Sequence, residues 1–188
     1  IIEMSQAAGI TLVKGDEKNP LYTTTFGVGE MIKDAIKRGC RHFIVGIGGS
    51  ATNDCGVGML QALGYELLDS EGKQVGFGAM GVRDIVTIED KNVIPNLLEC
   101  SFRVACDVKN PLCGEFGCSA VFGPQKGATE EMVKDMDAWL LRYSKLVKEK
   151  YPDADALFPG TGAAGGLGYA FHNFTNSSME SGIKIVLD

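Results

Sequence analysis

The chain has 188 residues, of which 45% are hydrophobic and 22% are charged. These shares are typical of a globular protein and exclude a disordered or coiled-coil chain. The net charge of −6 is spread along the chain without a basic stripe that could follow a nucleic acid backbone, so we expect no nucleic acid partner.

The start of the chain lacks the basic and then apolar pattern of a signal peptide, and no apolar run reaches the roughly 18 residues of a membrane span. We therefore expect a cytoplasmic protein with no membrane partner. The six cysteines form no Cys-x-x-Cys pair, which favours free thiols over disulfides or a metal site.

The first part of the chain reads as helix, strand, glycine loop and helix. Residues Thr25–Arg38 have apolar side chains at helical spacing and end before Gly39, which is typical of a glycine stop. The run His42–Ile47 predicts a strand buried in a parallel sheet, and Val57–Leu63 predicts a second helix.

The remaining elements continue this alternation. The longest predicted helix begins at Thr129, ends near Lys150 and is stopped by Pro152. The pattern also predicts four strands, at Tyr65–Asp69, Val82–Ile88, Ser101–Val108 and Ile183–Leu187. Residues 114–127 are predicted to form a glycine-rich loop and a short helix around a bound group, and residues 160–172 a helix of small residues.

This order predicts an α/β fold with a mainly parallel sheet and helices on both faces. We expect one α/β fragment over residues 1–188, without a firm internal boundary. The first residue is Ile1, and Ile183–Leu187 reads as a strand without a following cap, so we expect a piece of a longer chain.

The glycine loop between Gly46 and Asp54 is the clearest candidate site. A strand delivers the chain to a turn whose N–H groups approach a ligand, and a following helix N-terminus favours negative charge. The predicted donors to a carboxylate or phosphate are Gly48, Gly49, Ser50, Thr52 and Asn53. Asp54 is equally suited to handle a proton or metal and to cap the next helix.

Two other phosphate-binding loops provide the alternatives. The P-loop pattern Gly-x-x-x-x-Gly-Lys-[Ser/Thr] is absent from the sequence. A partial dinucleotide fingerprint starts at Gly46 and has Asp69 downstream, which leaves an oxidoreductase as a weaker hypothesis. The third glycine run, 160–168, is more typical of close helix packing than of a nucleotide loop.

Two further positions complete the candidate site. Asp107 ends a predicted strand, where open α/β sheets bind ligands, and Asn110 precedes a proline; both residues could instead stabilise their own turn. Lys126 lies in a glycine-containing segment where its ammonium could meet a phosphate, although a solvated surface lysine is equally compatible.

Several long motifs together resemble the bacterial-type glycerate kinases. The similarity spans nearly the whole chain and rests on Gly46-Ile-Gly-Gly-Ser-Ala-Thr-Asn-Asp54, Gly58-Met-Leu-Gln-Ala-Leu-Gly64, Ala105-Cys-Asp-Val, Asn110-Pro-Leu112, Ala120-Val-Phe-Gly-Pro-Gln-Lys-Gly-Ala128, Gly162-Ala-Ala-Gly-Gly-Leu-Gly168, Asn19-Pro20-Leu21 and Thr23 to Glu30. Cys55, Glu115 and Cys118 depart from the family's usual glycine, proline and alanine.

The resemblance implies transfer of a phosphoryl group from ATP to a hydroxyl of D-glycerate, with Mg²⁺ on the phosphates. It implies that the glycine loop binds the anion, that Asp54 or Asp107 orients the hydroxyl or the metal, and that Lys126 stabilises the transferred charge. It also implies a central fragment that has parts of two lobes and an incomplete active site, and that we expect to be inactive alone; it names no metal ligands. A non-catalytic module that binds a hydroxy acid is the alternative, and a monomer and a homodimer are equally compatible.

Overall fold

The computed structural model describes residues 1–187, and its centre is a four-stranded sheet. The strands are β1 (Ile2–Glu3), β2 (His42–Gly46), β5 (Ser101–Ala105) and β6 (Ser177–Glu180). They lie side by side in the order β1-β2-β5-β6, and every neighbouring pair is parallel. The predicted α/β class with a mainly parallel sheet is therefore confirmed.

The helices around the sheet vary in length. They are α1 (Ser5–Ala8), α2 (Phe26–Lys37), α3 (Val57–Ala62), α4 (Gly78–Asp84), α5 (Cys118–Phe122), α6 (Glu130–Lys150), α7 (Ala163–Phe174) and α8 (Gly182–Leu187). Short 3₁₀ turns occupy Ile10–Leu12, Gly15–Glu17, Pro95–Glu99 and Pro124–Lys126. Within the described residues, no helix combines the length and the apolar character needed to cross a bilayer.

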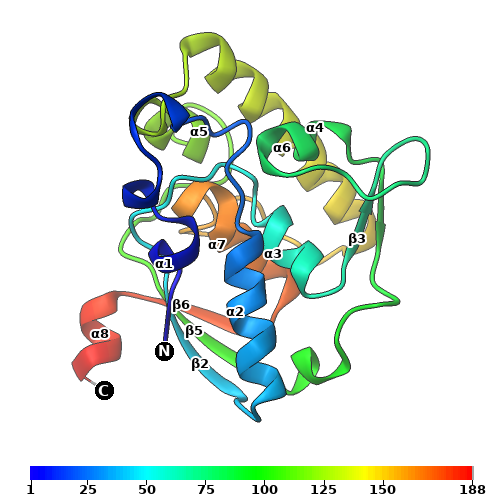
Figure 1. Ribbon diagram of the computed structural model, residues 1–188, viewed down its shortest axis with the longest axis vertical. Helices are drawn as coiled ribbons and strands as arrows, with labels where there is room; N and C mark the ends of the chain where they lie inside the picture. Colours follow the sequence, from blue (N-terminus) through cyan, green and yellow to red (C-terminus); the bar gives the residue numbers. More distant parts are fainter. Residues whose placement is uncertain (188) are drawn as a thin grey trace.

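One face of the sheet carries the core. The strands follow one another across the sheet in chain order, so right-handed crossovers place α2, α3 and α7 on the same side (Figure 1). Phe43 and Val45 of β2 pair in register with Phe102 and Val104 of β5, and all four side chains are buried. The Phe43 and Phe102 rings stack with centroids 4.9 Å apart.

The other face is only partly covered. Ile44 and Arg103, whose side chains alternate with those of the core, are half-buried. Arg103 donates two hydrogen bonds of 3.0 Å to the carboxylate of Glu180. Lys184 of α8 lies 3.3 Å from the same carboxylate, which shows that α8 begins on this side.

A smaller antiparallel pair stands beside the main sheet. It consists of β3 (Glu66–Leu68) and β4 (Thr87–Glu89), with Leu67 opposite Ile88. Both of these side chains belong to the same buried cluster as the core of the main sheet, and α6 packs against β4. The pair therefore extends the hydrophobic core.

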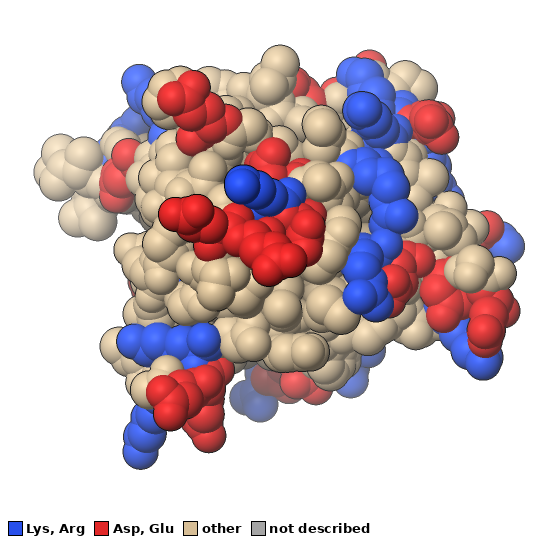
Figure 2. All heavy atoms as spheres, turned by 90° about the horizontal axis from the view of Figure 1, so that it is seen from above, with Lys and Arg blue, Asp and Glu red and all other residues tan. Residues whose placement is uncertain are grey.

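The outer surface mixes both signs of charge. Figure 2 shows the end of the molecule where α5 and the start of α6 lie, with acidic side chains gathered around a basic one and a band of basic side chains beside them. Because these charges alternate over short distances, this face presents no extended field of one sign.

Two predicted strands were wrong. Residues Ile183–Leu187 form α8, because the place beside β5 is taken by Ser177–Glu180, whose polar side chains gave no strand signal. Most of Val82–Ile88 lies in α4 or the turn after it, and only its last two residues enter β4. The start of α4 is held by a hydrogen bond from Met80 N to the Leu21 carbonyl, a contact that no local pattern reveals.

Candidate functional site

The glycine loop leaves β2 at the carboxyl edge of the sheet, as predicted. Gly49 has a left-handed φ of 70°, and its carbonyl accepts a 2.8 Å hydrogen bond from Ile10 N. Within residues 1–187, no protein acceptor is recorded for the N–H groups of Gly48, Gly49 and Ser50. A Cβ added to Gly48 would meet no atom within 4 Å, so this backbone borders open space.

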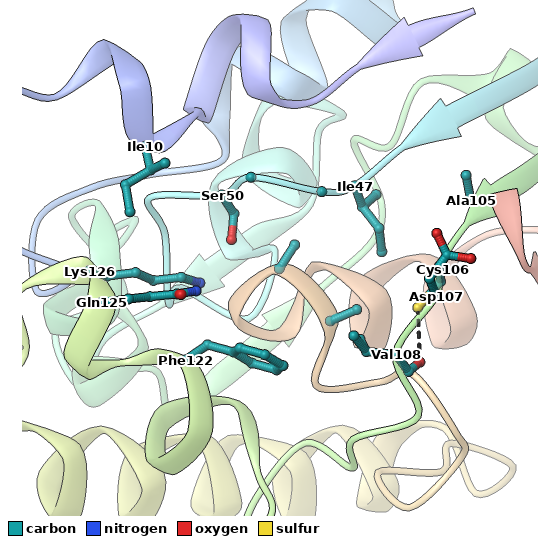
Figure 3. Close-up of a pocket in the computed structure, with 14 residues that line it drawn as sticks. Ile10, Ile47, Ser50, Ala105, Cys106, Asp107, Val108, Phe122, Gln125 and Lys126 are labelled. Carbon is teal, nitrogen blue, oxygen red and sulfur yellow. Dashed lines mark hydrogen bonds between the residues drawn. The ribbon is translucent and has the colours of Figure 1, made fainter.

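That space is a cavity of about 340 Å³. It is lined by Ile10, Ile47, Gly48, Gly49, Ser50, Ala105, Cys106, Asp107, Val108, Phe122, Gln125, Lys126, Ala163 and Ala164. In Figure 3, Ser50, Gln125 and Lys126 point into one end, and Asp107 lies at the other. The structure therefore brings together the loop after β2, the end of β5 with the segment after it, the end of α5 with the turn Pro124–Lys126, and the start of α7.

Lys126 lies at the polar end of the cavity. Its side chain is only 2% exposed, and its Nζ donates a 2.6 Å hydrogen bond to the Thr52 carbonyl oxygen. Burial lowers the pKa of the ammonium to about 8. A nearly desolvated cation with one recorded protein acceptor is well placed to bind an anion in the cavity.

Asp107 lies at the opposite end, directly after β5. The residue is exposed, and its Oδ1 accepts a 3.0 Å hydrogen bond from Gly182 N. No protein donor to Oδ2 is recorded in the part of the chain that the structure describes. This carboxylate is available for a hydroxyl or a cation, at the edge where the sequence placed it.

Asp54 is fully buried and is not among the residues that line the cavity. Its carboxylate accepts five hydrogen bonds: from Thr24 Oγ1, from Thr25 N and Oγ1, and from Gly56 N and Gly58 N. Desolvation raises its pKa, and these hydrogen bonds act in the opposite direction. Asp54 thus joins the start of α2 to the start of α3. This arrangement resembles the alternative considered from the sequence, in which Asp54 caps the next helix.

Three other residues that were predicted to bind substrate or phosphate also lie behind the cavity wall. Thr52 and Asn53 are fully buried, and Asn53 Nδ2 donates a 2.8 Å hydrogen bond to Ser119 Oγ. Asn110 Nδ2 donates a hydrogen bond to the Phe116 carbonyl, so Asn110 stabilises its own turn. None of the three is among the cavity-lining residues.

The structure adds wall residues that the sequence analysis missed. Gln125 precedes Lys126 and points the same way in Figure 3; its signals in the sequence were this adjacency and its place in the motif from Ala120 to Ala128. At the start of α7, Ala164 lines the cavity in a left-handed conformation, with φ 53°. A Cβ on Gly165 would lie 1.9 Å from the Thr52 carbonyl oxygen, so this glycine run serves close packing, as expected.

The left-handed turn of α7 faces a second left-handed residue. Cys55, with φ 54°, donates a 2.9 Å hydrogen bond from its N–H to the Gly165 carbonyl oxygen. Among residues 1–187, Cys55 and Ala164 are the non-glycine residues with a positive φ. Since this conformation is strained for residues with a Cβ, the glycine loop and α7 stabilise one another in it.

Comparison with known proteins identifies the family of the chain. The model of the glycerate kinase family matches residues 1–188. Glycerate kinase from Haemophilus influenzae is 50% identical over 188 residues, covering 100% of this chain and 50% of the relative. Glycerate 2-kinase from Escherichia coli is 45% identical over 185 residues, covering 98% and 49%.

A solved structure shows the same fold. The crystal structure of a Salmonella typhimurium LT2 protein assigned as glycerate kinase 2 superposes with a TM-score of 0.97 at 45% identity, over 100% of this chain and 50% of that one. The chain spans about half the length of the relatives it matches. By the family match and these likenesses over its whole length, the chain belongs to the glycerate kinase family.

Proposed function

We propose that the chain forms the substrate-binding part of a glycerate kinase, which transfers a phosphoryl group from ATP to a hydroxyl of D-glycerate. The observation that carries the proposal is one cavity with unpaired N–H groups and an ammonium at one end and a carboxylate at the other. Phosphoryl transfer depends mainly on such positioning and charge.

The polar end suits the anionic groups of the reaction. The N–H groups of Gly48, Gly49 and Ser50 would hold the glycerate carboxylate or the incoming phosphoryl group. Lys126 would stabilise the negative charge that these groups carry. Both contacts use backbone and ammonium donors already present on the cavity wall.

Asp107 is the proposed acceptor for the reacting hydroxyl or the ligand for Mg²⁺. Mg²⁺ in kinases is held by one or two carboxylates together with substrate phosphates, so the single carboxylate of Asp107 fits this ion. Within residues 1–187, no group of three acidic, cysteine or histidine side chains could hold a metal, which agrees with sharing the ion with substrate. The bound ion would neutralise phosphate charge.

Asp54 acts differently in this proposal. It contacts no cavity space, and its five hydrogen bonds fix the loop that presents the N–H groups. We assign it as a positioning residue that acts through the loop. Thr52 acts in the same way, since its carbonyl holds the Lys126 ammonium.

A cytoplasmic location belongs to the same proposal. All six cysteines, Cys40, Cys55, Cys100, Cys106, Cys113 and Cys118, are free thiols, as is typical of proteins in a reducing compartment. The proposed partners are D-glycerate, ATP and Mg²⁺, and a homodimer fits as well as a monomer.

Calorimetric titration tests the binding part of the proposal. D-Glycerate is titrated into the chain and into Lys126→Gln, and glycerol serves as the ligand without a carboxylate. We expect D-glycerate to bind, glycerol not to bind, and Lys126→Gln to weaken binding at least tenfold. Equal binding of glycerol and D-glycerate contradicts the assignment of the polar end.

ADP formation from ATP, Mg²⁺ and D-glycerate, measured with the longer enzyme of which this chain is the proposed substrate-binding part, tests the chemistry. Asp107→Asn should reduce the rate at least 100-fold, which is the lower range for loss of an acid–base group. Asp135→Asn on the exposed side of α6 is the matched control and should leave the rate unchanged. Full turnover by Asp107→Asn removes this carboxylate from the reaction. If the unsubstituted longer enzyme binds D-glycerate but forms no ADP, the chain is a binding module and not part of a kinase.

A further inference from the structure

A second cavity of about 260 Å³ adjoins the first one. The two share the segment Cys106–Val108, which follows β5. The remaining walls of the second cavity are Phe158, Pro159 and Met179, with Lys109, Glu180 and Ser181 completing the lining. A ligand that fills both cavities therefore passes over Asp107.

The apolar walls are held in place by specific contacts. The Phe158 ring stacks on His172, with ring centroids 3.9 Å apart and an angle of 15° between the planes. Gly160 has a φ of 96°, and a Cβ there would lie 2.8 Å from Met179 Cε and 3.0 Å from Cys106 Sγ. The absence of a side chain at Gly160 leaves room for these two sulfur-containing side chains, both of which line the cavity.

The ionic groups around the second cavity largely compensate one another. Hydrogen bonds from Arg103 and Ser178 keep the pKa of Glu180 low, at about 2, so this group is ionised. Its charge is neutralised by Arg103 and by Lys184, 3.3 Å away, and the other two charged lining residues, Asp107 and Lys109, have opposite signs. The first cavity differs, with the Lys126 ammonium and unpaired N–H groups.

The apolar lining and the balanced charges suit a neutral aromatic ring. Such ligands bind between apolar side chains with a few polar groups that set their orientation, and methionine adapts well to ring faces. Within residues 1–187, no protein partner is recorded for the Lys109 ammonium or the Ser181 hydroxyl, so both can contact ring nitrogens or the ring face.

We propose that the second cavity binds the adenine base of the nucleotide, while its phosphates extend past Asp107 into the first cavity. This inference rests on the proposed kinase function and adds to it the place of the base. It assigns Phe158, Met179 and Ser181 to nucleotide binding and leaves the glycerate carboxylate in the first cavity.

The experiment uses adenosine and inorganic phosphate as separate probes of the two cavities, each titrated into the chain by calorimetry. Ser181→Trp places a bulky ring in the exposed opening of the second cavity, and Ser70→Trp in an exposed turn is the matched control. We expect Ser181→Trp to weaken adenosine binding at least tenfold and phosphate binding less than twofold. Ser70→Trp should change neither affinity.

A reciprocal variant separates the two cavities. Lys126→Met should weaken phosphate binding at least tenfold without changing adenosine binding. Phe158→Ala provides a second test of the base site, with folding checked by circular dichroism. The proposal is overturned if the unsubstituted chain binds no adenosine at millimolar concentration. It is also overturned if neither Ser181→Trp nor Phe158→Ala weakens adenosine binding, or if Lys126→Met abolishes adenosine binding.

Failure of the kinase proposal gives a different result. In that case D-glycerate does not bind, or Lys126→Gln leaves its affinity unchanged, while adenosine still responds to Ser181→Trp. The adenine site then stands without the glycerate site.

Discussion

Lys126 Nζ donates its hydrogen bond to the carbonyl oxygen of Thr52, a residue of the glycine loop, over 2.6 Å. The contact joins the turn after α5 to the loop after β2, so that the ammonium and the unpaired N–H groups face the same cavity. The side chain is almost fully buried there, which makes its protonation sensitive to pH near neutrality.

We expect anion binding to weaken as the pH rises through about 8, because the pKa of Lys126 is lowered to about 8 by burial. Sulfate is the suitable probe, since its own charge stays constant over this range. Its affinity, measured by calorimetry between pH 6.5 and 9.5, should fall at least tenfold in the unsubstituted chain. Lys126→Met should bind weakly at every pH, and a pH-independent affinity of the unsubstituted chain contradicts the assignment.

The same burial predicts how stability depends on pH. The folded pKa near 8 lies below the value of about 10.4 in an unfolded chain, so the unfolded state binds more protons between these two limits. Stability therefore rises with pH over this window. Relative to Lys126→Met, the free energy of unfolding in urea should increase by roughly 3 kcal/mol at most, and a decrease shows that the buried ammonium is not destabilised.

Asp54→Asn should destabilise the fold strongly. Thr25 N and Gly58 N donate to Oδ2 and Gly56 N donates to Oδ1, so the amide NH2 group faces at least one N–H donor whichever way it is placed. A buried network broken in this way costs about 2–4 kcal/mol, measured as the free energy of unfolding in urea. Asp107→Asn, at an exposed carboxylate, is the control and should cost less than about 1 kcal/mol. A stability equal to that of the unsubstituted chain places Asp54 outside the structural role.

Two adjacent alanines at the cavity should respond oppositely to glycine. Ala164 has a φ of 53°, so Ala164→Gly relieves a conformation that is unfavourable by about 1 kcal/mol and should raise the melting temperature. Ala163 has no positive φ, so Ala163→Gly adds only the entropy of glycine, about 0.5–1 kcal/mol, and should lower it. The melting temperatures of the two variants are measured by calorimetry. A lower melting temperature in both variants shows that Ala164 is unstrained.

The thiols should react at very different rates with a thiol reagent. Cys40 is exposed, whereas Cys55 and Cys118 are buried, and burial raises the pKa of both of these thiols. Since the thiolate is the reactive form, we expect Cys40 to react first and Cys55 and Cys118 to react only on unfolding. Mass spectrometry of the labelled peptides identifies the order, and rapid labelling of Cys55 in the folded chain contradicts the packing of the glycine loop against α7.

Part of the candidate site could be predicted because it follows from the sheet edge. The carboxyl ends of parallel strands meet, so the loop after β2 and Asp107 after β5 were expected to come together, and both line the cavity. Lys126 was also named from its place between glycines. The burial of Asp54 was not predicted, because its partner Thr25 lies 29 positions away.

The sequence alone determined the alternation of helices and strands, the position of the glycine loop and the membership in a family, since periodicity and motifs are properties of neighbouring residues. The tertiary structure decided which polar groups face the cavity and which lie beneath it, that Ser177–Glu180 and not Ile183–Leu187 pairs with β5, and that Ala164 turns left-handed. Those outcomes depend on contacts such as Lys126 with Thr52, 74 positions apart, whose geometry exists only after the segments have packed.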